Sequence, residues 1–241
     1  MDQVKRAIIM AAGKGERMQP LTLTTPKPLV RVNGRRMIDS VIGALRRNGI
    51  EEIYVVVGYR KECFAGLPAE YPGLRLIENP WFDTCNNISS LYVAREHIED
   101  SIILDGDQLI FDDAALAPAF DGSGYNAVWT DEPTTEWLLT ADETGTVTGC
   151  SRTGGAGGWR LVSISRWNAA DGRRLRACLE KEFDGGNRQI YWDDVALFCY
   201  PALFSLKVRP MAADAEAEID TLAELAAADP TYARYLEEGK I

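Results

Sequence analysis

Two segments near the N-terminus carry residue types that could bind a nucleoside triphosphate. In AIIMAAGKGERM at residues 7–18, a run with the composition of a buried strand turns directly into a small and basic loop; TPKPLV follows at residues 25–30. Small residues let backbone N–H groups approach an anion closely, and Lys and Arg side chains could meet phosphate charge there. The predicted phosphate-binding residues are Ala11, Ala12, Gly13, Lys14, Gly15, Glu16, Arg17 and Lys27.

The glycine spacing excludes two well-known nucleotide motifs. A P-loop needs four residues between its glycines and then Gly-Lys-Ser/Thr, which this segment lacks. The dinucleotide motif needs a third glycine three positions after the second, where this chain has Met18. An ordinary glycine-rich turn remains the alternative for GKG alone, but Arg17 and the TPKP segment favour phosphate binding.

The same residues carry a family resemblance. AAGKGERM followed by TPKPL resembles the signature of the sugar-nucleotide pyrophosphorylase-like nucleotidyltransferases, which join a nucleoside triphosphate to a phosphorylated small molecule. Later blocks resemble the choline-phosphate cytidylyltransferases of bacterial surface decoration, so the likeness covers nearly the whole chain. These blocks are NPWFDTCNNISSLYVAREHI at 79–98, ILDGDQLIF at 103–111, TEWLLTADE at 135–143, IYWDD at 190–194 and EID at 218–220.

The composition is that of an acidic globular protein. Its 241 residues carry 26 Lys and Arg against 36 Asp and Glu, a net charge of −10 without a basic block, which argues against nucleic acid or a membrane as partner. The basic residues Arg31, Arg35 and Arg36 are expected on a solvated face. Five widely spaced cysteines and the absence of a signal peptide or a long apolar stretch favour a reduced, cytoplasmic protein.

Strand and helix patterns alternate in the first half of the chain. Such alternation predicts an α/β fold, a Rossmann-like, mostly parallel sheet flanked by helices, with ligands beyond the carboxyl ends of the strands. The loops at Gly13, Gly58 and Asp107 follow such ends and could face one cleft. The predicted strands are 7–10, 53–57, 75–78 and 101–104, and the predicted helices are 37–48, ending at Gly49, and 88–98.

The second half predicts a small mixed-sheet lobe that binds the acceptor. We expect one domain over 1–241, with a nucleotide-binding half of about 1–125 and an acceptor-binding half of about 126–241. The glycine-rich segment 151–158 could be a lid, and 195–200 could be helix or strand. The predicted strands are 127–130, 137–141, 146–150, 160–165 and 206–209, and the predicted helices are 171–183 and the last 20 residues.

A phosphomonoester acceptor has a second pKa of about 6, so it is already mostly dianionic at neutral pH and needs no general base. Nucleotidyl transfer to it mainly requires electrostatic stabilisation of the phosphate charges. This agrees with a single histidine, His97, that we expect to be structural. Mg²⁺ is the expected cofactor. Asp107, after an apolar strand, is the first candidate ligand, and Asp105 could contact the ribose or support Asp107. The resemblance implies that Asp220 completes the metal site, although EID could equally cap a helix.

The acceptor and the base are predicted from less specific patterns. Aromatic faces and carboxylates hold a quaternary ammonium, since it donates no conventional hydrogen bond. The resemblance at EWLL and IYWDD favours such a cage over a core role, with Tyr191 rather than Trp192 in it. The predicted acceptor residues are Trp137, Tyr191, Asp194 and Glu218. The remaining nucleotide contacts are expected from Gly58, Tyr59, Asn86, Asn87 and Ser90, although the last three could simply cap a helix.

These observations give one hypothesis with two alternatives. The expected reaction is CTP and phosphocholine to CDP-choline and pyrophosphate, with Mg²⁺ and with Lys27, Arg17 and Asp107 as catalytic residues. Transfer to another phosphorylated acceptor is the first alternative: a sugar 1-phosphate, phosphoethanolamine or an aminoalkyl phosphonate. A catalytically silent nucleotide-binding subunit is the second. Many choline-phosphate enzymes have an apolar residue in place of Lys14, which leaves the base preference open, and a monomer or a homodimer is expected.

Overall fold

Strand β2 (Arg6–Ala11) forms the centre of the sheet, between the parallel strands β7 (Ser101–Asp105) and β5 (Glu52–Val57). The structure is a computed structural model that describes residues 1–238. Strand β6 (Leu74–Glu78) adds to β5 in parallel. These strands confirm the four predicted in the first half, because continuous apolar runs suit a parallel sheet that is covered on both faces.

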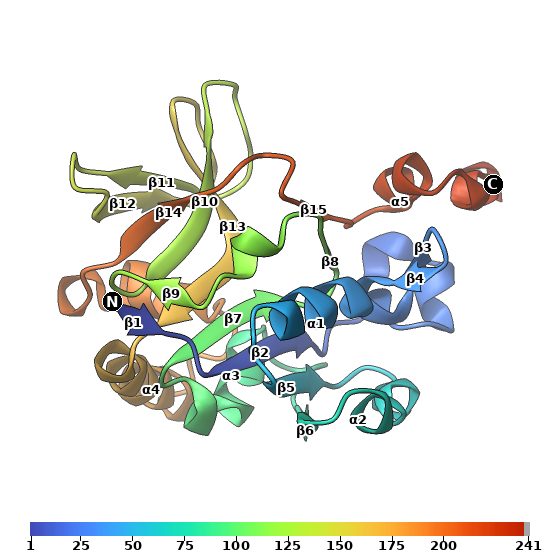
Figure 1. The fold of residues 1–241 in the computed structure, drawn as a ribbon, viewed down its shortest axis with the longest axis horizontal. Helices are drawn as coiled ribbons and strands as arrows, with labels where there is room; N and C mark the ends of the chain where they lie inside the picture. Colours follow the sequence, from blue (N-terminus) through green and yellow to red (C-terminus); the bar gives the residue numbers. More distant parts are fainter. Residues whose placement is uncertain (239–241) are drawn as a thin grey trace.

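Helices cover the two faces of this sheet (Figure 1). Alternate residues point to opposite faces, so Ile9 packs with α1 (Met37–Arg47), whereas Ile8 packs with α3 (Ile88–Val93) and α4 (Ala169–Asp184). Gly49, with φ of +77°, follows α1 as predicted. The short helix α2 (Leu67–Glu70) packs on the α1 side.

The predicted lobe grows from the same sheet. Strand β13 (Gly158–Trp167) pairs antiparallel with β7 and continues into the lobe, where it also pairs with β10 (Gly124–Thr130) and β11 (Leu138–Ala141). β12 (Val147–Ser151) pairs with β11, and β14 (Lys207–Pro210) runs parallel to β10, so the lobe is mixed. It rises above the central strands in Figure 1.

The C-terminal segment returns to the nucleotide-binding half. β15 (Glu216–Glu218) pairs with β8 (Gln108–Ile110), and the helices α5 (Leu222–Ala228) and α6 (Ala233–Glu238) follow. Leu225 of α5 is buried against Met18 and Met37, beside the hairpin of β3 (Arg31–Val32) and β4 (Arg35–Arg36). The predicted C-terminal helix is thus two helices, and its last residues, 239–241, lie outside the described part. Strands β1 (Asp2–Gln3) and β9 (Ala119–Phe120) form a separate pair.

Two helical expectations differ in detail. The predicted helix 88–98 ends as α3 at Val93 and continues as a 3₁₀ turn, Arg95–His97, in which His97 stacks on Tyr54 with ring centroids 3.6 Å apart. Segment 195–200 contains a π-helical turn, Val195–Cys199, and not a strand. No helix among the described residues is long and apolar enough to cross a bilayer.

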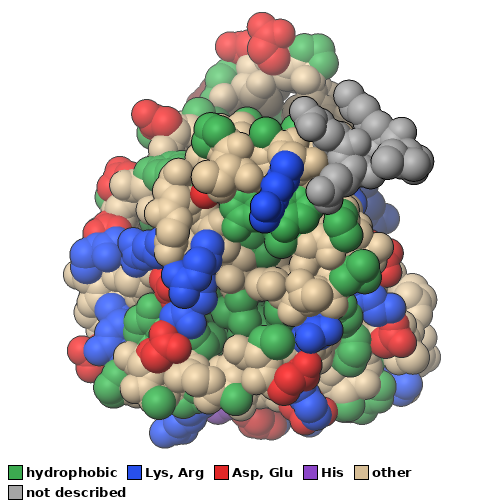
Figure 2. All heavy atoms as spheres, turned by 90° about the vertical axis from the view of Figure 1, so that its right-hand side faces the viewer, with side chains coloured by type: hydrophobic (Ala, Val, Ile, Leu, Met, Phe, Trp, Pro, Cys, Tyr) green, Lys and Arg blue, Asp and Glu red, His purple; other side chains and the backbone are tan. Residues whose placement is uncertain are grey.

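Figure 2 shows the end of the molecule that lies at the right of Figure 1. On this face, Lys and Arg side chains gather on the left flank.

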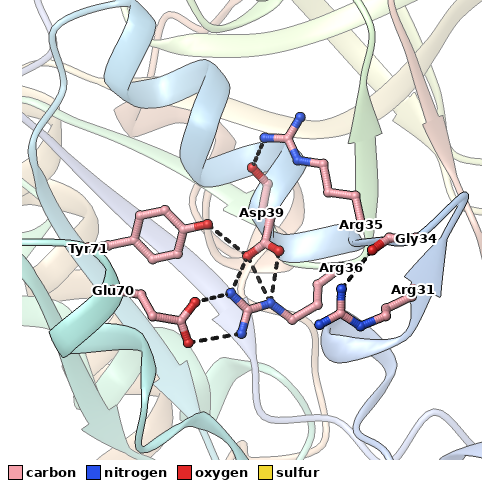
Figure 3. Close-up of polar contacts among 7 residues, drawn as sticks. All are labelled: Arg31, Gly34, Arg35, Arg36, Asp39, Glu70 and Tyr71. Atoms are coloured by element: carbon pink, nitrogen blue, oxygen red, sulfur yellow. Dashed lines mark hydrogen bonds and ion pairs between the residues drawn. The ribbon is translucent and has the colours of Figure 1, made fainter.

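The expectation that Arg31, Arg35 and Arg36 all lie on a solvated face is wrong for Arg36. Its guanidinium lies between Asp39, with Nε 2.8 Å from Oδ2, and Glu70 (Figure 3). Tyr71 donates its hydroxyl to the same Asp39, at 2.9 Å. The cluster joins α1 to α2.

Candidate active site

Lys27 is the central cation of the site. It begins a 3₁₀ turn, Lys27–Leu29, and its side chain is only 9% exposed. Its Nζ lies 2.6 Å from Asp107 Oδ2 and 2.6 Å from Asp220 Oδ1. Burial alone would lower the pKa of Lys27, but the two carboxylates outweigh it and raise the pKa. Lys27 is therefore charged at neutral pH.

The AAGKGERM loop closes over Lys27. Gly15 has φ of +62°, and a Cβ there would lie 3.0 Å from Cβ of Lys27, so this position requires glycine. Thr22 donates its hydroxyl to the carbonyl of Gly15 at 2.9 Å and holds the turn. Arg17, on the outer side, places Nη2 2.7 Å from Asp220 Oδ1. Lys14 forms an ion pair with Asp83.

Carboxylates from two distant segments meet beside Lys27. Asp105 ends β7, Asp107 lies two residues further on, and Glu218 ends β15; one oxygen of each lies within 4.8 Å of the others. Burial, then the nearby Asp107, raises the pKa of Asp105 and of Glu218. Asp107 Oδ1 is buried and has no hydrogen-bond partner among residues 1–238. Several close oxygen donors, one of them unpartnered, suit a hard divalent cation such as Mg²⁺.

Two cavities open onto these carboxylates. The first, of about 570 Å³, is lined by residues 10–17, Lys27, Pro28, Phe82, Asp83, Asn87, Ser90, Asp105, Asp107, Glu218 and Asp220, and is called the nucleotide cavity after the ligand that the sequence predicts there. The second, of about 550 Å³, lies under the lobe and is called the acceptor cavity for the same reason. The two share the lining residues Arg17, Asn87, Asp105, Glu218 and Asp220. Ligands bound in the two cavities would therefore both lie against these five shared side chains.

Aromatic rings and acids line the acceptor cavity. The rings of Trp137 and Tyr191 meet edge to face, with centroids 5.7 Å apart. Trp192 is buried and stacks on Tyr125, 6.2 Å between centroids. The acids that line this cavity are Asp105, Glu136, Asp193, Glu216, Glu218, Asp220 and Glu224.

Comparisons with known proteins identify the family of the chain. Residues 7–218 match the MobA-like NTP transferase domain. The chain belongs to that family. A 2-aminoethylphosphonate cytidylyltransferase of Lancefieldella rimae is 40% identical over 229 residues, 94% of this transferase and 92% of that protein. A choline-phosphate cytidylyltransferase of Streptococcus pneumoniae is 34% identical over 192 residues, 79% and 82% of the two chains.

Solved structures show the same architecture. The CTP:phosphocholine cytidylyltransferase of Streptococcus pneumoniae superimposes with a TM-score of 0.86 at 31% identity and covers 98% of both chains. The inositol-1-phosphate CTP transferase of T. maritima, at 19% identity and a TM-score of 0.76, shares the fold. The transferase described here is thus a nucleotidyltransferase, and both relatives named above are cytidylyltransferases.

Most of the predicted site residues of the transferase lie along these two cavities, and four lie outside both linings: Gly58, Tyr59, Asn86 and Asp194. Tyr59 supports the loop, because its N–H bonds to the carbonyl of Ala12 at 3.0 Å. Asn86 donates its amide to the carbonyl of Gln189 at 3.2 Å. Asn87 reaches the acceptor side, where its Oδ1 accepts the N–H of Trp192 at 2.9 Å.

Asp194 acts behind the acceptor cavity. Its carboxylate accepts the N–H of Tyr191 at 2.8 Å and the Nε–H of Arg152 at 2.8 Å. Arg152 belongs to segment 151–158, in which Gly155 also exchanges two backbone hydrogen bonds with Thr134. The expected lid is thus tied down on both sides in this structure, and a movement of it stays a prediction.

Sequence reasoning missed several lining residues. Asp193 faces the acceptor cavity next to Tyr125, and burial, then Asp105, raises the pKa of Asp193. Ser163 and Arg160 point into the same cavity from β13, and Glu216 does so from β15. Asp193 could have been considered from the sequence, because it belongs to the same IYWDD block as the predicted Tyr191 and Asp194. Simple alternation along β13 could not have indicated Ser163, because all of residues 160–165 line this cavity where the register of β13 against β10 shifts.

Proposed function

We propose that this transferase joins CTP to a small acceptor that carries a phosphonate or phosphate near an ammonium group, and that it releases pyrophosphate. 2-Aminoethylphosphonate is the acceptor that we propose, with phosphocholine as the second candidate. The observation that carries this proposal is the junction of the two cavities. A polyanion-binding loop and an aromatic, acidic cavity share five lining residues, as two substrates that react with each other require.

The chemistry follows from the charges at the junction. An oxygen of the acceptor attacks the α-phosphorus of CTP, and pyrophosphate leaves in line. Lys27 would hold the α-phosphate, and Arg17 and Lys14 would meet the β- and γ-phosphates. The buried position of Lys27 strengthens its attraction for phosphate oxygens, because less water screens it. The acceptor acid is already ionised at neutral pH, so the chain has no need of a general base.

A divalent metal agrees with the residues present. Asp107, grouped with Asp105 and Glu218, would hold Mg²⁺, which when bound neutralises phosphate oxygens of the nucleotide. Asp220, the other predicted ligand, lies outside that group of close oxygens but lines the same cavity and would join it. Asp220 is paired with Lys27 and Arg17 in the structure. Binding of a triphosphate would offer these two cations stronger partners and so free the Asp220 carboxylate.

The acceptor cavity supports a cationic substrate. Trp137 and Tyr191 offer ring faces and edges, and the acids around them give the cavity a negative charge. A primary ammonium can use both the rings and the acids, since it donates up to three hydrogen bonds. Greater identity and coverage in the Lancefieldella rimae relative favour 2-aminoethylphosphonate. The aromatic pair favours phosphocholine, because a trimethylammonium binds through ring faces.

Pyrophosphate release tests the proposal directly. The assay crosses CTP, UTP, ATP, GTP and dTTP with 2-aminoethylphosphonate, phosphocholine, phosphoethanolamine and glucose 1-phosphate, in the presence of Mg²⁺. We expect turnover with CTP and 2-aminoethylphosphonate. Turnover with phosphocholine alone would establish the second candidate. No release with any pair, together with measurable CTP binding, would contradict the proposal and support a catalytically silent nucleotide-binding subunit.

A further inference from the structure

The antiparallel pair of β8 and β15, beside the catalytic carboxylates, contains buried polar side chains without partners. Gln108 is fully buried, and neither its Oε1 nor its Nε2 has a hydrogen-bond partner among residues 1–238. Glu216 is only 7% exposed, and its Oε2 is likewise unpartnered within the described chain. Desolvating such groups without a partner is unfavourable, so each calls for an explanation.

Glu216 faces the acceptor cavity. It stands two residues before Glu218 on β15, so both side chains lie on the same side of the strand, and both line this cavity. Arg160 lines the cavity too, but no ion pair between Arg160 and Glu216 is present in the described part of the chain. The carboxylate is thus buried, turned toward a substrate-sized space and unpaired.

Several other acids of the site have partners or a place in the metal cluster. Asp220 holds Lys27 and Arg17, and Asp107 holds Lys27. Asp105 and Glu218 lie with Asp107 in the group of close oxygens. Glu136, Asp193 and Glu216 of the acceptor cavity belong to neither set. Glu136 is exposed and Asp193 half-buried, whereas Glu216 is buried with an unpartnered oxygen. Its negative charge is therefore free to meet a positive group of the acceptor.

We propose that Glu216 is the residue by which this transferase selects a primary ammonium. Its carboxylate accepts a charge-assisted hydrogen bond from the –NH₃⁺ group of the acceptor, while the Trp137–Tyr191 pair contacts the carbon chain and the ammonium face. A trimethylammonium has no N–H to donate, and its methyl groups hold its charge away from the carboxylate. The inference rests on the proposed function and names the specificity determinant of the acceptor cavity.

A series of N-methylated acceptors tests this role. We compare kcat/KM for 2-aminoethylphosphonate, its N-methyl, N,N-dimethyl and N,N,N-trimethyl derivatives, and phosphocholine, with CTP saturating. Wild type should lose kcat/KM along the series. E216Q, which keeps the shape of the side chain, should lose about 10- to 100-fold with 2-aminoethylphosphonate, mostly in KM. It should change little with the trimethyl acceptors and leave the KM for CTP unchanged.

Glu143→Gln is the matched control, because Glu143 is an exposed acid of the lobe outside both cavities. It should behave as wild type with every acceptor. An equal loss with all acceptors in E216Q, or no loss with 2-aminoethylphosphonate, would overturn the role of Glu216.

Equilibrium binding of 2-aminoethylphosphonate, measured by calorimetry without CTP, separates this inference from the proposed function. Binding that weakens in E216Q but not in E143Q supports Glu216 even if the nucleotide proves not to be CTP. Binding equal in wild type and E216Q, or no binding at all, overturns the role of Glu216.

Discussion

At the scale of single residues, Lys27 is the cation on which the charge balance of the site depends. We expect Lys27→Met to lower kcat/KM for pyrophosphate release by roughly 10²- to 10³-fold, the usual cost of losing one preorganised electrostatic partner of the reacting groups. Circular dichroism should show an intact fold. Lys14→Met, which removes a cation at the rim, should cost less. Near-wild-type turnover in Lys27→Met would contradict the catalytic assignment.

Trp137 carries the corresponding prediction for the acceptor. Its ring forms one side of the acceptor cavity and meets Tyr191 edge to face. Trp137→Ala should raise the KM for the acceptor at least tenfold, since an aromatic contact with a desolvated cation contributes about 2 kcal/mol. The KM for CTP should change much less. Equal increases in both constants would indicate a purely structural tryptophan.

The sequence could predict site residues where a motif stands on a regular element. Lys27, Arg17 and Asp107 follow from strand ends and small loops, and the structure brings all three into the nucleotide cavity. In the turn at 191–194 there is no periodicity to decide which of two adjacent acids points inward. Asp193 faces the cavity, whereas the predicted Asp194 holds the backbone of Tyr191 from behind.

At the scale of elements, hydrophobic runs predicted the parallel strands because their buried faces leave few alternatives. The lobe was less predictable. Strand β13 was expected at 160–165 but spans ten residues, since its pairing with both β7 and β10 extends it at each end. Such pairings between distant segments leave little trace in local composition. The same is true of the Arg36 cluster, which joins α1 to α2.

This cluster predicts a stability effect away from the site. Arg36→Met would leave the largely buried carboxylate of Asp39 without its cation. We expect the free energy of unfolding to fall by about 2 kcal/mol, measured by urea denaturation. Lys61→Met removes an exposed partner of Glu78 and should change it by less than about 1 kcal/mol. A similar small change in both variants would show that the cluster contributes nothing special.

At the scale of the whole molecule, a protein of net charge −10 must bring two anionic substrates together. The site itself is rich in acids: seven line the acceptor cavity, and three of these line the nucleotide cavity as well. Lys14, Arg17 and Lys27 offset only part of this negative charge. The balance must come from ligands, a metal at the carboxylates and an ammonium in the acceptor cavity, so substrate and metal binding should be strongly coupled.

Metal binding should therefore depend on pH. Burial and Asp107 raise the pKa of Asp105 and of Glu218, so without metal these carboxyls keep their protons to a higher pH than ordinary acids do. A divalent cation needs them ionised and must displace those protons. Mn²⁺ titrated calorimetrically between pH 6 and 8 should bind more tightly as the pH rises, with proton release visible as a dependence of the heat on buffer ionisation enthalpy. Glu218→Gln should reduce the number of protons released. An affinity that is constant across this range would show that the carboxyls are already ionised and would contradict the raised pKa values.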